Sequence, residues 1–187
     1  MERYKVTIKG KTPIVFNTRQ EKLDLEISKL EKNRLAEWEK TNWRKKALRD
    51  DKGNIIIPIV WIKSAFENAC KHSRIIPHFA TSKKETYTRY AGSMFFDKSS
   101  FRCSEKDLEL ISSYMGGQGA GSKTKVLKYF PKITKWETSF EIADPEGRMN
   151  ISELKSLLEY AGLFEGIGDF RRVNCGRFEV TSINKTK

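Results

Sequence analysis

The segment YAGLFEGIGDFRRVNCGRFEV, residues 160–180, joins an amphipathic stretch to a run of alternating apolar residues. A plain connection between a helix and a strand needs about two to six residues and one glycine. This segment instead carries several glycines and arginines: Gly162, Gly166, Gly168, Arg171, Arg172, Gly176 and Arg177. Glycines let backbone amides approach a phosphate closely, and a guanidinium can bind two phosphate oxygens at once. The segment therefore predicts a loop that contacts a phosphate backbone.

The flanking residues predict a helix before this loop and a strand after it. Asn150 and Glu153 have the spacing of a capping box at the start of the helix, and Gly162 suits its C-terminal end. Apolar residues at helical spacing form the core stripe: Ile151, Leu154, Leu157, Leu158 and Ala161. GRFEVTSI, residues 176–183, predicts the last strand.

The first half of the chain predicts two strands and two helices. RYKVTIKG (residues 3–10) alternates apolar and polar residues, as in a half-buried strand. Good helix formers predict one long, exposed helix over about residues 19–48. IIIP (residues 55–58) predicts a short buried strand. The helix that follows Pro58 has a clear core face: Ile59, Ile62, Phe66, Ala69 and Cys70.

Beyond residue 91 the pattern predicts further strands around a short helix. GSMFFD (residues 92–97) predicts a strand, and SEKDLELISSYM (104–115) predicts a short helix with Ser104 as its N-cap and Asp107 at the capping-box position. GGQGAGSK (116–123) predicts a loop. KVLKYFPKITKWETSFEIAD (125–144) predicts one or two strands, on one of which Trp136, Thr138, Phe140 and Ile142 share a face.

The order of these elements predicts an α+β fold. Without the insertions it is β-α-β-β-α-β, the ferredoxin-like (RRM-like) pattern of an antiparallel sheet with helices on one face. We expect a single domain over residues 1–187, with a helical insertion at about 18–50 and a basic loop at about 72–91. The open face of such a sheet often binds single-stranded RNA.

The composition favours a cytoplasmic globular protein. Of the 187 residues 38% are hydrophobic and 32% charged, and no run is apolar enough to span a membrane. The charged, alternating N-terminus is unlike a secretory signal. Cys70, Cys103 and Cys175 fit neither a disulfide framework nor a metal motif. We expect no metal and no cofactor.

The net charge of +12 favours a polyanionic partner, nucleic acid before an acidic membrane surface. The positive charge is concentrated in residues 71–90 and 122–135, where lysines and arginines stand beside aromatic residues. Cations beside stacking rings are typical of single-stranded nucleic-acid binders. The predicted contacts in these segments are Arg74, Lys83, Lys84, Tyr87, Arg89, Tyr90, Lys123, Lys125, Lys128 and Tyr129.

Two other features of the sequence bear on whether the protein is an enzyme. GGQGAGSKT (residues 116–124) lacks the lysine directly after the second glycine of a nucleotide-binding P-loop. His72 and His78 are the candidates for general acid–base catalysis, because a histidine suits metal-independent RNA cleavage.

The C-terminal motif GIGDFRRVNCGRFEV resembles the glycine-rich loop of the RAMP superfamily. VTIKGKTPIVF (residues 6–16) and NIIIPIVWIKSAFENAC (54–70) resemble its first strand and the segment leading into its first helix. The family includes backbone subunits of CRISPR effector complexes and CRISPR RNA-processing nucleases, and short relatives occur in phages and other mobile elements. The resemblance implies that the loop contacts nucleic acid through Gly166, Gly168, Arg171, Arg172, Gly176 and Arg177.

The leading hypothesis is a non-catalytic protein that binds single-stranded nucleic acid, RNA before DNA, and multimerises along the strand, with other effector subunits as further partners. One alternative is a metal-independent CRISPR-type endoribonuclease that uses His72 or His78. Another is a protein-binding adaptor that docks its partner on the long helix.

Overall fold

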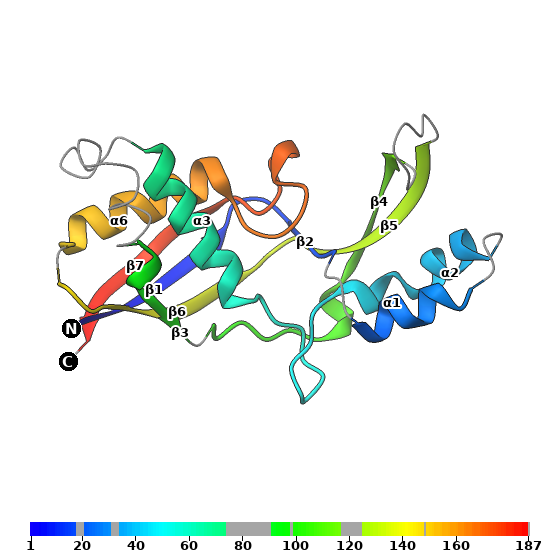
Figure 1. Ribbon diagram of the computed structural model, residues 1–187, viewed down its shortest axis with the longest axis horizontal. Coiled ribbons are helices and arrows are strands. Elements are labelled where there is room, and N and C mark those ends of the chain that lie inside the picture. The colour runs from blue at the N-terminus through cyan, green and yellow to red at the C-terminus, as the bar shows by residue number, and fades with distance from the viewer. Residues whose placement is uncertain are drawn as a thin grey trace.

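The computed structural model describes residues 1–17, 21–30, 34–73, 91–97, 99–116, 125–147 and 149–186 (Figure 1). It has an α+β architecture with two antiparallel sheets. The predicted contacts Arg74, Lys83, Lys84, Tyr87, Arg89, Tyr90 and Lys123, and the alternative catalytic residue His78, lie outside these ranges.

The larger sheet has four strands in the order β3-β6-β1-β7. They are β1 (Glu2–Gly10), β3 (Phe95–Asp97), β6 (Glu137–Asp144) and β7 (Phe178–Thr186). In β1, Tyr4, Val6 and Ile8 are buried, whereas the residues between them face outward, as the alternation predicted. The predicted shared face of β6 is also confirmed, because Trp136, Thr138, Phe140 and Ile142 are all buried.

Two helices, α3 (Ile59–His72) and α6 (Ile151–Tyr160), cover one face of this sheet (Figure 1). Ile62 and Phe66 of α3 and Leu154 and Leu157 of α6 are at most 1% exposed, so the two stripes supply the core. The predicted capping box starts α6: the N–H of Glu153 donates to Asn150 Oδ1 over 2.9 Å, and the N–H of Asn150 donates to Glu153 Oε2 over 3.1 Å.

The smaller sheet has three strands in the order β2-β5-β4. They are β2 (Ile14–Val15), β5 (Lys125–Ile133) and β4 (Glu109–Gly116). Because β1 leads into β2 and β5 leads into β6, the two paired central strands of the larger sheet continue into the smaller one. In Figure 1, β4 and β5 extend away from the larger sheet, beside α1 (Glu21–Ser28) and α2 (Leu35–Asn42).

Three local predictions were wrong. The region 19–48 is not one helix: α1 ends at Ser28, and a 3-10 turn, Trp43–Lys46, follows α2 and buries Trp43. The surface proposed for an adaptor is therefore interrupted. Residues 104–115 form only one 3-10 turn, Glu105–Asp107, with the expected Ser104–Asp107 capping box, before β4 begins. Ile55 makes isolated bridges to Arg49 and Cys103 and belongs to no strand of either sheet.

Candidate nucleic-acid interface

The loop over residues 166–177, called here the glycine loop, joins the end of the α6 segment to β7. After α6 the chain continues through a wider turn, Ala161–Glu165, and leaves it at Gly166 with φ 67°. Gly162, predicted as the helix end, lies inside that turn, where a Cβ would come within 2.2 Å of the carbonyl oxygen of Phe178. The glycine that ends the helical backbone is therefore Gly166.

The glycines of the loop allow close packing against other backbone segments. A Cβ on Gly168 would come within 2.8 Å of Val15 O, and one on Gly176 within 1.7 Å of Ile167 O. The N–H of Gly176 donates to Pro13 O over 2.8 Å, and the N–H of Ile167 donates to Gly176 O over 3.0 Å. These bonds fix the loop on the connection between β1 and β2.

Close backbone packing explains why glycine is needed at these positions. Contact of Gly166, Gly168 and Gly176 with nucleic acid stays a prediction. The N–H groups of Gly166 and Gly176 already donate to Ala161 O and Pro13 O, each over 2.8 Å. These two N–H groups therefore serve the fold.

A contact between two aromatic rings holds the loop against the smaller sheet. Phe170 has a left-handed backbone with φ 58°, which is costly for a non-glycine residue. Its ring lies 5.0 Å from that of Phe130 of β5 in an edge-to-face arrangement. The loop therefore contacts the smaller sheet as well as the β1–β2 connection, at the junction between the two sheets.

The three predicted arginines have different environments. Arg171 and Arg172 are exposed in a 3-10 turn, Arg171–Val173, and neither forms an ion pair with a carboxylate of the described residues. Arg177 is half-buried; its Nη2 donates to Arg171 O over 3.0 Å, and its Nη1 is buried without a hydrogen-bond partner in the part of the chain described here. Arg177 thus supports the turn, whereas Arg171 and Arg172 are exposed.

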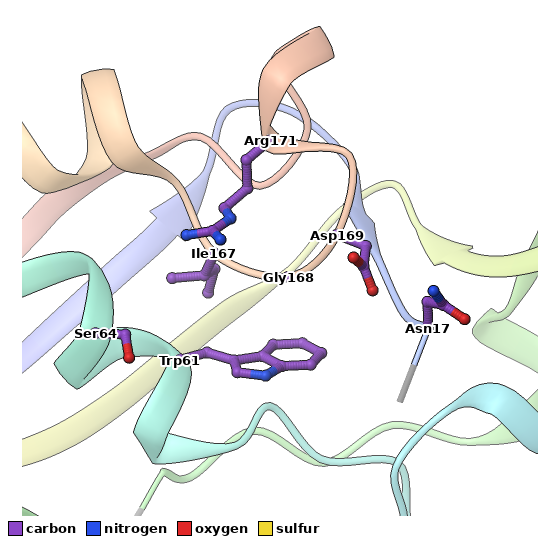
Figure 2. Close-up of a pocket in the computed structure, with 7 residues that line it drawn as sticks. All are labelled: Asn17, Trp61, Ser64, Ile167, Gly168, Asp169 and Arg171. Carbon is purple, nitrogen blue, oxygen red and sulfur yellow. The ribbon is translucent and has the colours of Figure 1, made fainter. Parts of the chain in front are cut away.

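A pocket of about 360 Å³ opens beside the loop (Figure 2). It is lined by Asn17, Trp61, Ser64, Ile167, Gly168, Asp169 and Arg171. In Figure 2 the Arg171 side chain extends from the loop and ends beside Ile167, Asp169 lies on the other side of Gly168 with Asn17 next to it, and the indole of Trp61 lies across from the loop. Three separate segments of the chain therefore meet around one concave space.

Burial raises the pKa of the Asp169 carboxyl from its ordinary value. The charge of Arg171 and a hydrogen bond from the backbone N–H of Asn17 act in the opposite direction. Asp169 is itself held in place, because its N–H donates to Val15 O over 2.9 Å.

The predicted contacts on β5 are only partly available. The Nζ of Lys128 lies 3.8 Å from Glu39 Oε1 of α2, and Tyr129 is half-buried. Lys125 is exposed near the start of the strand, five residues from Phe130, which at the rise of an extended chain is about 17 Å. The structure therefore places Lys125 well away from the glycine loop.

Lys46, which the sequence did not single out, accounts for much of this arrangement. Its Nζ donates to Tyr129 O over 2.8 Å and lies 3.2 Å from Glu39 Oε2, and both charged side chains are buried. Burial lowers the pKa of Lys46, while Glu39 opposes that effect. This ion pair fastens α2 and the turn after it to β5.

The alternative catalytic residue His72 is exposed at the end of α3. Its Nδ1 lies 2.8 Å from Glu165 Oε1 in the turn that precedes the glycine loop. Over the described ranges, no group of three or more His, Cys, Asp or Glu side chains could hold a metal ion.

The face of the larger sheet opposite α3 and α6 carries charges of both signs. Arg3 and Lys5 face the same side as Glu141, and Arg3 Nη1 lies 3.9 Å from Glu141 Oε2. Phe95 of β3 is 65% exposed on this side. The positive charges on this face are therefore partly offset by a neighbouring carboxylate.

No protein-family model matches the sequence, and no curated protein matches it. The fold is similar to that of a chain in the cryo-EM structure of the Type III-B Cmr-beta bound to cognate target RNA, with a TM-score of 0.57 and 13% sequence identity. The match covers 100% of this chain and 61% of that chain, so this protein spans less than two thirds of the other's length. At this identity the likeness concerns the fold. In the part of the chain described, no helix is both long and apolar enough to cross a membrane.

Proposed function

We propose that this protein binds single-stranded RNA as a non-catalytic, backbone-like subunit related to the RAMP superfamily and to CRISPR effectors. The observation that carries the proposal is the turn Arg171–Val173: two exposed guanidinium groups stand on a loop that is hydrogen-bonded and packed from both sides. Cations held in a fixed position bind a phosphate backbone with little loss of conformational entropy.

The fold supports the same reading. We propose that the larger sheet, whose strands lie in the order β3-β6-β1-β7, forms a ferredoxin-like core with α3 and α6. The similar chain belongs to an assembly solved with target RNA. The net charge of +12 adds a long-range attraction to any nucleic acid.

Exposed apolar residues beside the loop support multimerisation. Leu163 and Phe164 are 61% and 56% exposed in the turn after α6, and Phe164 packs on Tyr160. Adjacent large apolar side chains on a surface commonly mark a protein–protein contact. We propose that a second copy of this chain covers them when several copies line one strand.

Fluorescence anisotropy with a labelled thirty-nucleotide RNA across a salt series tests the binding proposal. The double variant Arg171→Glu/Arg172→Glu is expected to weaken binding roughly 10- to 100-fold for every sequence. It should also reduce the slope of log affinity against log salt by about 1.4, because each contact with a single strand contributes about 0.7. The matched control is Lys52→Glu/Lys106→Glu, which reverses two exposed lysines that lie elsewhere on the surface. Equal losses in both variants would contradict a specific role for the arginine turn.

A second candidate is the metal-independent endoribonuclease, favoured by the carboxylate that contacts His72. A carboxylate can orient an imidazole for proton transfer. Incubating RNA with the protein in EDTA separates the two functions. We expect the RNA to stay intact; cleavage that disappears in His72→Ala would replace our proposal with this one.

A further inference from the structure

The pocket beside the glycine loop has a composition that phosphate binding does not explain. Its volume of about 360 Å³ falls within the range of small-ligand sites, roughly 300–1,000 Å³. An aromatic ring, an apolar residue and several polar groups line the same space. A carboxylate in this position would repel a phosphate, so the occupant must present hydrogen-bond donors to it.

Asp169 is held by the loop but not neutralised by an ion pair within the described ranges. Its own N–H is bonded to Val15 O, and the next residue, Phe170, is packed on Phe130. An ionised carboxylate has about four acceptor sites, and among the described residues the N–H of Asn17 donates to it. A partly buried carboxylate gains from a ligand that donates hydrogen bonds to it.

Trp61 supplies a flat surface opposite the carboxylate. It lies off the buried stripe of α3 and is only half-buried, unlike its neighbour Ile62. Phe16 contacts it at 5.7 Å between ring centroids, with the rings tilted by 43°, which fixes the indole from one side. An indole held in this way is a typical stacking partner for an unpaired base.

We propose that this pocket binds an unstacked guanine base of the bound RNA, an inference that rests on the RNA-binding function proposed above. Trp61 stacks on the base, Asp169 accepts from its N1–H and N2 amino groups, and Arg171 contacts the adjoining phosphate. Asn17 lies where its amide can donate to O6 of the same base.

Guanine is the base whose Watson–Crick edge matches a carboxylate. It places two donors, N1–H and the amino group, side by side. Adenine and cytosine place a ring acceptor beside their amino group, and uracil places carbonyl oxygens on both sides of its single N–H, so each would set a lone pair against Asp169.

The test compares two labelled RNAs, a thirty-nucleotide uridine tract and the same tract with guanine at every third position. The wild-type protein is expected to bind the guanine-containing strand about tenfold more tightly. Asp169→Asn and, separately, Trp61→Leu should reduce this preference to nearly one. Asp51→Asn, a change of the same kind at an exposed turn, should keep the preference.

Urea denaturation of each variant reports whether it still folds. Equal wild-type affinities for the two RNAs would overturn the guanine site and leave the RNA-binding function intact. If neither RNA binds, the proposed function fails, and titration with GMP and AMP decides the pocket. A preference for GMP that is lost in Asp169→Asn then assigns the pocket to a free guanine nucleotide, whereas no preference overturns the guanine site too.

Discussion

Replacing Gly176 with alanine tests whether the glycine loop is fixed by close backbone packing. Gly176 has φ 71°, a left-handed conformation that costs an L-residue about 1–2 kcal/mol. A methyl group there would come within 1.7 Å of the carbonyl oxygen of Ile167. Backbone atoms cannot move aside as a flexible side chain can, so the loop must open to accommodate the methyl group.

Opening the loop would break further contacts, so the free energy of unfolding should fall by more than the backbone strain alone costs. Two backbone hydrogen bonds involve Gly176, one to Pro13 O at 2.8 Å and one from the N–H of Ile167 at 3.0 Å. Each contributes about 0.5–1.5 kcal/mol, and the contact between Phe170 and Phe130 contributes a similar amount. We therefore expect Gly176→Ala to lower the free energy of unfolding by about 2–4 kcal/mol more than conformational strain alone does.

Gly53 provides a matched control. It also has a left-handed backbone, with φ 82°, but a methyl group on it would meet nothing within 4 Å. Gly53→Ala should therefore show the conformational cost alone, about 1–2 kcal/mol before the gain from a stiffer unfolded chain.

Urea denaturation followed by circular dichroism gives the free energy of unfolding of both variants, and thermal denaturation gives their melting temperatures. For a chain of 187 residues, the expected difference corresponds to about 5–15 °C in melting temperature. If the two variants lose the same stability, within about 0.5 kcal/mol, then close packing is not the role of Gly176 and the loop is looser than the structure indicates.

Three further predictions concern the buried ion pair, the pocket and the apolar turn. Lys46→Met should lower the free energy of unfolding by about 3 kcal/mol, because among the described residues it leaves the buried Glu39 with only the longer ion pair to Lys128, at 3.8 Å. The double variant with Glu39→Leu should recover most of that loss in urea denaturation. Asp169→Asn should raise the melting temperature at pH 7: its pKa is raised in the folded protein, so the ionised form opposes folding above the unfolded pKa, and the gain should vanish near pH 3, where both states are protonated. A melting temperature unchanged at both pH values would contradict that sign. Leu163→Ser/Phe164→Ser should reduce the number of copies bound per thirty-nucleotide RNA, measured by light scattering, without weakening the first binding event; unchanged stoichiometry would remove this turn from the contact between copies.

Local sequence patterns were sufficient to predict the helices and strands whose structure is determined by nearby residues. The alternation in β1 and the capping box at Asn150 both predicted elements that the structure confirms. In α3 the helical spacing correctly identified Ile62 and Phe66 as core residues. Such patterns act within a few residues, so no knowledge of the tertiary fold is needed to interpret them.

The errors occur where distant segments decide the structure. Residues 109–116 contain enough helix-compatible residues to suggest a helix, but eight cross-strand partners on β5 make them a strand. Region 19–48 has strong helix formers throughout, yet the chain turns after α2 so that Trp43 and Lys46 can be buried. Tertiary packing outweighs a propensity of a few tenths of a kcal/mol per residue, roughly the range among ordinary residues.

In the candidate site, too, the local features were predicted correctly and the contacts between distant segments were not. The glycine loop was identified from its composition, but its glycines were linked to phosphate contact, whereas the structure uses them first for packing on residues 13–15. Trp61 and Asn17 were missed because their relation to Asp169 exists only in three dimensions. The sequence offered only a weak indication of Trp61 as a site residue: it is a tryptophan next to Ile62 but outside the core stripe of α3.

The contacts that stiffen the loop also position both of its proposed binding groups. Asp169 is fixed by its bond to Val15 O, and Arg171 follows two residues later, after the packed Phe170. A base held at Trp61 and a phosphate held at Arg171 would therefore have a set separation, determined by the backbone of the loop rather than by side-chain flexibility. This geometry favours a bound nucleotide whose base is turned away from its neighbours. It also implies that changes at Pro13, whose carbonyl oxygen anchors Gly176, should weaken base preference and strand affinity together, although Pro13 lines neither site.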